Sequence, residues 1–240
     1  MHLESLVFHP DRFPSQEAYP FNLEIFRSTK ALEFPAPVTF FVGENGSGKS
    51  TLLRAIARRC GIHIWEGLER ARLSNNPFEE ELYKYIEVRW SRAPVPGSFF
   101  AAELFRSFSQ SVDEWAINDP EVLHTYGGKS LLVQSHGQSH LAFFTHRFRL
   151  EGLYLLDEPE NALSPKSQLL FLDLLRKFSK TGISQFILAT HSPLLLSLQG
   201  ARIYCFDRLP LKPIDYEHTE HFRVYRKFFE QYRAAGGSSR

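Results

Sequence analysis

The sequence predicts an α/β fold, with a mostly parallel central sheet and helices on both of its faces. Two observations support this prediction. First, short and almost wholly apolar runs, such as 38–42 and 185–189, are typical of strands that are buried on both faces. Second, these runs alternate with amphipathic stretches such as 165–180. Strands that alternate with helices favour a parallel sheet, because each helix carries the chain back to the same end of the sheet.

The N-terminal part is expected to form an antiparallel β region. We expect strands over 3–8 and 21–26, followed by a central buried strand at 38–42 (VTFFV). The segment 50–59 (STLLRAIARR) predicts a helix, because its apolar residues recur at helical spacing. A glycine-rich segment therefore joins a buried strand to a helix.

The middle of the chain, about 61–128, has the weakest periodicity. Residues 83–90 predict a strand and 99–108 predict a helix, with a turn at 94–97 between them. A small helical subdomain is expected beyond them, with a helix from 137 to about 146. The remaining strands and helices are expected at 153–156, 165–180, 185–189, 203–206 and 220–233.

The chain is expected to form one domain over 1–234, with the middle region of about 61–150 inserted in its core. The tail at 235–240 (AGGSSR) has the composition of a flexible segment. A hydrophobic share of 43% and a charged share of 23% over 240 residues are typical of a globular protein. The formal net charge of +1 argues against a strongly basic nucleic-acid binder, although it allows a local basic patch.

Cysteine usage and hydropathy indicate the compartment. Cys60 and Cys205 are predicted to be buried, reduced thiols, because neither has a second cysteine at metal-ligand spacing. The N-terminus lacks the apolar core of a signal peptide, and no run of about 18 apolar residues occurs. These features predict a cytoplasmic protein that does not itself insert into a membrane.

The segment 43–51 (GENGSGKST) has the spacing of a nucleotide-binding phosphate loop. Its glycines let the backbone turn N–H groups around a phosphate, and the following helix adds the positive end of its dipole. Lys49 would reach the β- and γ-phosphates of ATP, Ser50 would offer its hydroxyl to Mg²⁺, and Thr51 would support the α-phosphate. The expected cofactor-binding residues of the loop are Glu44, Asn45, Gly46, Ser47, Gly48, Lys49, Ser50 and Thr51.

Two adjacent acids end a second apolar strand, in 152–160 (GLYLLDEPE). Asp157 would hold the Mg²⁺ shell together with Ser50. Glu158 would polarise the water that attacks the γ-phosphate. His191 follows a third apolar strand, at the end that faces the ligand crevice of an open α/β sheet. We expect its ring to hydrogen-bond the γ-phosphate and the attacking water, so the predicted catalytic residues are Glu158 and His191.

A second anion site is predicted at 134–138 (QSHGQ), directly ahead of a helix. Ser135, Gly137 and Gln138 are its candidate cofactor-binding residues, because the N-terminus of a helix attracts anions. The alternative is an ordinary capped helix, in which Ser135 serves as the N-cap.

These motifs, in this order, resemble those of the ABC-type ATPase superfamily. GENGSGKS is similar to Walker A, SHGQ to the signature motif, GLYLLDEPE to Walker B and THS to the switch-histidine loop; NALS, at 161–164, falls where the D-loop lies. The form DEPE resembles the soluble SMC and RecF-like branch, and the chain looks most like small predicted AAA/ABC-type ATPases. The resemblance implies a P-loop ATPase fold and Mg²⁺-dependent ATP hydrolysis.

The resemblance also implies a homodimer with composite sites. Two copies would dock head to tail, so that 135–138 of one copy caps the γ-phosphate held by Lys49 of the other. The sequence departs from the family at His136, where a glycine is usual. The glutamine loop has no clear match, and Glu103 and Gln110 are its candidates. Tyr19 and Phe13 are candidates for stacking on adenine, with ordinary packing as the alternative for each.

Three functions are weighed for such a chain. The leading one is a soluble ABC/SMC-like ATPase whose ATP-driven dimer acts on a macromolecular partner, with DNA among the candidates. The others are the ATPase subunit of a membrane transporter and a nucleotide-dependent module of a defence or toxin system. Basic residues within 54–72 and 223–233 would serve DNA binding, or would simply form solvated helix faces.

Overall fold

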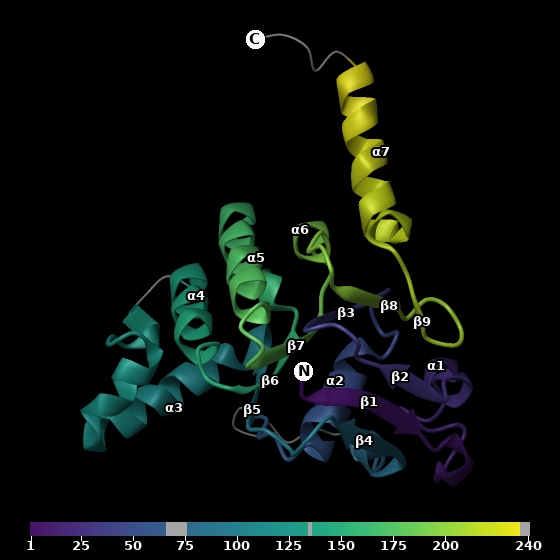
Figure 1. Ribbon diagram of the computed structural model, residues 1–240, viewed down its shortest axis with the longest axis horizontal. Coiled ribbons are helices and arrows are strands. Elements are labelled where there is room, and N and C mark those ends of the chain that lie inside the picture. The colour runs from purple at the N-terminus through teal and green to yellow at the C-terminus, as the bar shows by residue number, and fades with distance from the viewer. Residues whose placement is uncertain (66–75, 134–135, 236–240) are drawn as a thin grey trace.

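Two β-sheets form the framework of the computed structural model, which describes residues 1–65, 76–133 and 136–235 (Figure 1). In the larger sheet the five strands β5, β6, β7, β3 and β8 run parallel, and β9 pairs antiparallel with β8 at one edge. The prediction of a mostly parallel sheet is therefore confirmed. In spatial order the larger sheet contains β5 (Gly97–Ala101), β6 (Gly152–Asp157), β7 (Ser184–Ala189), β3 (Val38–Val42), β8 (Arg202–Cys205) and β9 (Lys212–Pro213).

The smaller sheet is antiparallel, in the order β2 (Ala31–Glu33), β1 (Leu3–Phe8) and β4 (Ile86–Trp90). The predicted antiparallel N-terminal region is thus present, but the strand expected over 21–26 is wrong. Phe21 is buried ahead of a short helix, α1 (Glu24–Ser28). The buried residues of 21–29 are Phe21, Ile25, Phe26 and Thr29, a spacing that follows the helical period and not the alternation of a strand.

Six α-helices follow α1 in the described part of the chain. They are α2 (Lys49–Arg59), α3 (Phe105–Asn118), α4 (His136–Arg147), α5 (Pro165–Ser179), α6 (Pro193–Leu196) and α7 (Glu220–Ala234). The helix expected over 99–108 is wrong in its first part, because 97–101 form the edge strand β5 and the helix begins at 105. The strand expected over 83–90 is shortened by a 3₁₀ turn, η2 (Glu81–Tyr85). Short apolar runs such as these fit strand and helix alike.

The larger sheet separates two hydrophobic cores. In Figure 1, helices α4 and α5 lie on one side of it, and α2 with the N-terminal strands lies on the other. Along β3, Phe41 packs into the core of the N-terminal strands and α2. Its neighbours Phe40 and Val42 pack into the core under α4 and α5. Both faces of β3 are therefore covered, which explains why the strand is buried along its whole length and is mostly apolar.

The side chain of Gln185 joins the two sheets. It projects from β7 and is fully buried. Its Oε1 accepts hydrogen bonds from the backbone N–H groups of His2 and Leu3, at 2.9 and 2.7 Å, and its Nε2 donates to the carbonyl of Leu3 at 2.9 Å. One amide side chain therefore satisfies three buried backbone groups of the chain start.

Three further features bear on the predictions. Cys205 is buried and Cys60 is half-buried, and burial raises the pKa of the Cys60 thiol to about 12, so both favour the neutral thiol. Among the described residues, no helix combines the length and the hydrophobicity that a membrane crossing requires. Helix α7 stands away from the body and buries none of its residues (Figure 1). The tail beyond 235 lies outside the described residues.

Candidate functional site

The loop between β3 and α2 has the backbone that the glycine pattern predicts. Gly43, Gly46 and Gly48 have φ angles of 151°, 78° and 102°, a region in which side chains are rarely tolerated. A Cβ on Gly43 would also lie 2.8 Å from Oδ1 of Asp207, and one on Gly48 would lie 2.8 Å from the ring of Phe26. Glycine is therefore required at these two positions by conformation and by space.

Lys49 opens α2 and is 4% exposed. Its Nζ donates to the carbonyl oxygens of Gly43 and Glu44, at 2.7 and 2.8 Å, so the ammonium is held inside the loop. Burial lowers the pKa of Lys49, and the charges of Glu158 and Asp207 oppose that shift. Asp207 also accepts a hydrogen bond from the Glu44 N–H at 2.8 Å, which ties the loop to the end of β8. The loop is thus held by Lys49 from within and by Asp207 from the end of the neighbouring strand β8.

Asp157 lies at the end of β6, next to the first turn of α2. Its Oδ1 accepts a hydrogen bond from Ser50 Oγ at 2.9 Å, and its side chain is 7% exposed. Burial raises the pKa of Asp157 to about 6, against the stabilising hydrogen bond from Ser50 and the charge of Arg54. A buried carboxylate beside a hydroxyl, at the mouth of a phosphate loop, is a donor set that suits Mg²⁺.

Glu158 follows with an unusual backbone conformation. Among the described residues it is the only non-glycine residue with a positive φ, at 46°. Such a conformation costs about 1–3 kcal/mol and tends to occur at functional sites. Its Oε2 accepts a hydrogen bond from Asn161 Nδ2 at 2.6 Å, and its Oε1 lies 3.8 Å from His191 Nε2. The strained turn directs the carboxylate toward the histidine that follows β7.

His191 is held from two sides. Its backbone N–H donates to Oε1 of Glu160 at 2.6 Å, and its ring Nδ1 lies 3.3 Å from Nε2 of His221. Glu160 is 9% exposed, and burial raises the pKa of its carboxyl. Neither partner was among the predicted site residues. Glu160 had a signal, as the last acid of DEPE, whereas His221 lies in the segment 215–222 (DYEHTEHF), to which the sequence assigned no role.

The predicted second anion site is described only in part, since Ser135 lies outside the described residues. Gly137 and Gln138 lie in the first turn of α4. A Cβ on Gly137 would lie 3.4 Å from the carbonyl of Ala162 and 3.7 Å from Ser167 Oγ. This helix start therefore packs against the segment that links β6 to α5, and the cofactor role of 135–138 stays a prediction.

The two candidates for adenine stacking differ in how near they lie to the phosphate loop. The Tyr19 hydroxyl forms a short hydrogen bond with Thr51 Oγ1, and both residues line a cavity of about 220 Å³ beside the phosphate loop. Phe13 packs in the core instead, with its ring centroid 4.7 Å from that of Phe21. Of the two candidates, Tyr19 is thus the one that lies next to the loop.

The two candidates for the glutamine loop also differ in how near they lie to the phosphate loop. Glu103 follows β5, and its Oε1 accepts a hydrogen bond from Arg54 at 2.7 Å. Its charge contributes to the raised pKa of Asp157, so it lies near the phosphate loop. Gln110 lies within α3 and is exposed. The position of Glu103 therefore fits the role better.

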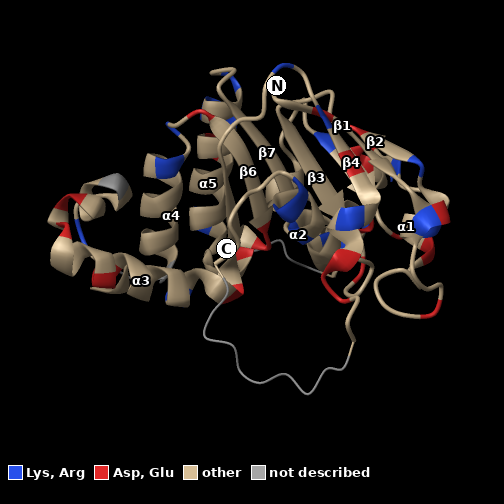
Figure 2. Ribbon diagram, turned by 90° about the horizontal axis from the view of Figure 1, so that it is seen from below, with Lys and Arg blue, Asp and Glu red and all other residues tan. Residues whose placement is uncertain are grey.

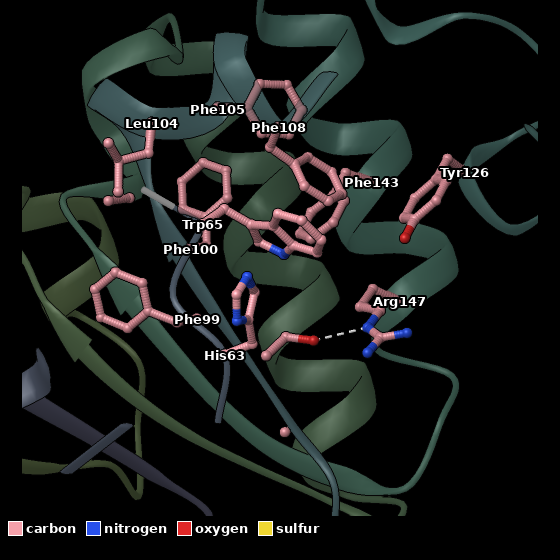
Figure 3. A pocket seen from close by; sticks show the side chains of 13 residues that line it. His63, Trp65, Phe99, Phe100, Leu104, Phe105, Phe108, Tyr126, Phe143 and Arg147 are labelled. Carbon is pink, nitrogen blue, oxygen red and sulfur yellow. Dashed lines mark hydrogen bonds between the residues drawn. The ribbon is translucent and has the colours of Figure 1, made fainter. Parts of the chain in front are cut away.

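An aromatic pocket lies apart from these residues, between β5 and the helices α3 and α4 (Figure 3). Its volume is about 170 Å³, and the rings of Trp65, Phe100, Phe108 and Phe143 fill much of the view. Arg147 closes one side, where its Nε donates to Ser98 Oγ at 2.7 Å. The pocket belongs to the core of the middle region, where aromatic packing holds α3 and α4 to the edge of the sheet.

Among the described residues, the two basic segments lie on separate elements, and some of their side chains pair with acids. Blue and red segments are interspersed over the face seen in Figure 2. In the first segment, Arg54 pairs with Glu103 and Arg58 with Glu80, while Arg70 and Arg72 lie outside the described residues. The second segment lies on the exposed helix α7, where Arg226 is 3.7 Å from Glu230.

Comparison with protein families gives two partial matches. Residues 120–197 match a family described as "AAA domain, putative AbiEii toxin, Type IV TA system". Residues 21–61 match a second AAA domain family. The first match covers the segment from the signature-like motif to the histidine, and the second covers the phosphate loop.

Curated relatives are transport ATP-binding proteins. The chain is 25% identical over 177 residues to the macrolide export ATP-binding/permease protein of Campylobacter jejuni, covering 68% of this chain and 27% of that protein. It is 25% identical over 197 residues to a probable siderophore transport ATP-binding protein of Bacillus subtilis, covering 71% of this chain and 70% of that protein. The chain therefore spans only about a quarter of the first of these relatives.

Solved structures share the fold. The SMC head domain from Thermotoga maritima aligns with a TM-score of 0.52 at 17% identity, over 90% of this chain and all of that one. The cbiO1 protein of Clostridium perfringens, part of an ABC transporter complex, aligns with a TM-score of 0.57 at 16% identity, over 98% of each chain. At these identities the likeness concerns the fold alone.

Proposed function

We propose that this chain, which resembles AAA- and ABC-type ATPases in sequence and shares their fold, binds ATP with Mg²⁺ and hydrolyses it. One observation carries the proposal. Five side chains from three separate segments meet at the same edge of the sheet. They are those of Lys49, Ser50, Asp157, Glu158 and His191. A hydroxyl, two carboxylates, an ammonium and an imidazole at a glycine-rich loop are the groups that phosphoryl transfer requires.

Each residue of this group has a proposed task. The N–H groups of 44–48 and the ammonium of Lys49 hold the phosphates, once the ammonium leaves the loop carbonyls that it now contacts. Ser50 and Asp157 hold Mg²⁺, which neutralises phosphate charge when bound. Tyr19, hydrogen-bonded to Thr51, faces the base. Glu103 takes the position of the glutamine loop.

Glu158 is the proposed general base. Its strained backbone and its hydrogen bond from Asn161 hold the carboxylate between the phosphate loop and His191. There it can accept a proton from the water that attacks the γ-phosphate. His191 donates a hydrogen bond to the γ-phosphate and so stabilises the charge that moves onto it.

Two copies complete the site in this proposal. Gly137, in the first turn of α4, lies against the carbonyl of Ala162 and Ser167 Oγ, and no contact with Lys49 of the same chain is among those described. A second copy docked head to tail would bring its 135–138 segment to the γ-phosphate, which gives two equal sites in a homodimer. The macromolecule on which the dimer acts is proposed to be another protein or DNA, with the exposed basic residues of α7 as the cationic surface.

A second candidate function has its own support. The family matched by residues 120–197 is described as a putative toxin of a toxin–antitoxin system. Under this proposal the chain is the nucleotide-dependent module of a defence system, with slow turnover. Expression of wild type and of a Lys49→Ala variant in a bacterial host distinguishes the two, because a toxin module would arrest growth only with the intact loop. The curated transport relatives favour a third candidate, a transporter ATPase subunit, which predicts co-purification with a membrane protein.

The proposed function is tested by replacing the base. Glu158→Gln keeps the shape of the side chain and removes its ability to accept a proton, so ATP hydrolysis should fall by at least about 100-fold. Binding of ATP should remain, and the ATP-bound homodimer should accumulate, as measured by sedimentation velocity with Mg²⁺-ATP.

Lys49→Ala is the matched variant, because it removes the phosphate contact and leaves the base. It should lose ATP binding in calorimetry and show no dimer with ATP. Unchanged ATP affinity in Lys49→Ala, or wild-type turnover in Glu158→Gln, would contradict the assignments.

A further inference from the structure

His221 lies in the first turn of α7, yet its ring packs against His191. The Nε2 of His221 and the Nδ1 of His191 are 3.3 Å apart, and the ring centroids are 5.4 Å apart. The two outer nitrogens, Nε2 of His191 and Nδ1 of His221, are buried without a hydrogen-bond partner among the described residues. The hydrogen bond between the rings is therefore the contact that sets where their protons lie.

Both rings are neutral in this environment. Burial is the main cause that lowers the pKa of each, and Lys49 lowers both further. The charge of His191, when present, would also lower the pKa of His221. A neutral imidazole has one N–H and one lone pair. One ring must therefore donate and the other must accept, which leaves two arrangements.

The surroundings distinguish these arrangements. If His191 donated from Nδ1, its Nε2 would present a lone pair to the Glu158 carboxylate 3.8 Å away, and His221 would bury an unpaired N–H at Nδ1. If His221 donates from Nε2, His191 carries its proton on Nε2, toward Glu158. His221 then buries only a lone pair. The second arrangement avoids both an acceptor facing an acceptor and a buried donor without a partner, each of which is costly.

We propose that His221 is a positioning residue, which fixes His191 with its ring proton on Nε2, aimed at Glu158 and at the place of the γ-phosphate. This inference rests on the proposed ATPase function for its consequence, since a hydrogen bond to the γ-phosphate requires a donor at Nε2. The other ring nitrogen sets the tautomer, as is usual for functional histidines. Because His221 belongs to α7, the position of this exposed helix is linked to the competence of the phosphate site.

The tautomer can be measured without any turnover. Long-range ¹⁵N–¹H correlation spectra of the nucleotide-free protein should show His191 protonated at Nε2. In His221→Glu the carboxylate can only accept, so the proton of His191 should move to Nδ1. A His191 that is protonated at Nδ1 in the wild type overturns the proposal, whatever the enzyme does with ATP.

Turnover tests the consequence. His221→Gln places an amide near the position of Nε2 and can still donate, so it should retain most of the wild-type kcat. His221→Glu should lower kcat by about 10- to 100-fold, the range typical when a group that orients a functional imidazole is lost. KM for ATP should not change in either variant, because the phosphate loop is intact. His221→Leu, which makes no hydrogen bond, should fall between them.

His218→Gln is the control, since His218 is exposed near the same helix start and its substitution should leave kcat unchanged. Thermal unfolding checks that each variant is folded. Equal kcat for the Gln and Glu variants would reduce His221 to a structural role and overturn the proposal. A wild type that binds but does not hydrolyse ATP would instead contradict the proposed function, while the spectra still decide the tautomer.

Discussion

Asp157 holds a charge that the folded protein disfavours. Its carboxyl is 7% exposed and has one hydroxyl donor, Ser50. The pKa of about 6 lies above the ordinary value of 3.8, so the folded state binds this proton more tightly than the unfolded state. The contribution of Asp157 to stability is therefore most favourable below about pH 4, and it becomes unfavourable as the pH rises from about 4 to 6. At neutral pH the ionised carboxylate of Asp157, the proposed Mg²⁺ ligand, therefore lowers the stability of the folded protein.

Asp157→Asn should release this penalty. In the nucleotide-free protein, the free energy of unfolding at pH 7 should increase by about 1–3 kcal/mol, while the gain should vanish near pH 4. Urea unfolding at several pH values measures the effect. Asp173→Asn, at an exposed position on α5, is the control and should change stability little. A variant that is less stable than wild type at pH 7 would contradict the shift. ATP hydrolysis should be lost, because the amide is a poor ligand for Mg²⁺.

The positions of single residues were predictable where a motif fixes the spacing. The glycines, Lys49 and Ser50 follow one another in sequence, and their geometry is local. His221 was not predictable, because its contact with His191 depends on how α7 leaves the sheet after β9. Glu160 was visible as the third acid of DEPE, but its bond to the His191 N–H required the position of the neighbouring strand.

At the scale of elements, Gln185 carries an unusual share of the sheet-to-sheet contact. Gln185→Leu would keep the volume roughly constant and leave two N–H groups and one carbonyl without their partner. We expect it to lower the free energy of unfolding by about 2–5 kcal/mol. Gln199→Leu, at an exposed position after α6, should have a small effect in the same chemical denaturation experiment. A loss for Gln185→Leu no larger than for the control would show that the two sheets are held by apolar packing alone.

The elements that were predicted correctly are those with long, unmixed patterns. Strands β3, β6 and β7 are mostly apolar and buried along their whole length, and α5 has 15 residues with a clear apolar stripe. The errors fall on short segments. Residues 97–101 form a strand because β6 offers a free edge for pairing, which no local pattern reveals. Residues 21–26 pack as a loop and helix because they cover α2 and the N-terminal sheet, and this tertiary contact overrides their strand-like composition.

At the scale of the whole molecule, α7 depends least on the rest of the protein. Thr219 caps its first residue by accepting from the Phe222 N–H at 3.2 Å, and His221 reaches His191. Beyond this first turn, five apolar side chains are about half exposed or more. They are Val224, Tyr225, Phe228, Phe229 and Tyr232. A helix of this length without tertiary contacts is only marginally stable in water.

Hydrogen exchange should therefore be graded along α7. Amides near the first turn should be protected, and those beyond about Arg226 should exchange almost as fast as in an unfolded chain. Mass spectrometry of peptides that cover 219–235 measures this gradient, with α5 as the internal reference because its buried face should protect it. Uniform, slow exchange along α7 would mean that a second copy covers it in solution.

The outer half of α7, which lacks tertiary contacts, also limits how tightly a binding partner can associate with it. Ordering a residue costs about 1–2 kcal/mol of backbone entropy. A partner that orders the outer turns of α7 must therefore offset that free energy with its own contacts. The aromatic rings provide a large contact area, yet much of the free energy gained by burying it would be offset by the cost of ordering the helix. Association through α7 should accordingly be brief and reversible. The hydrogen bond between His221 and His191 joins the start of α7 to the proposed phosphate site. Even brief binding of a partner to α7 can therefore affect that site directly.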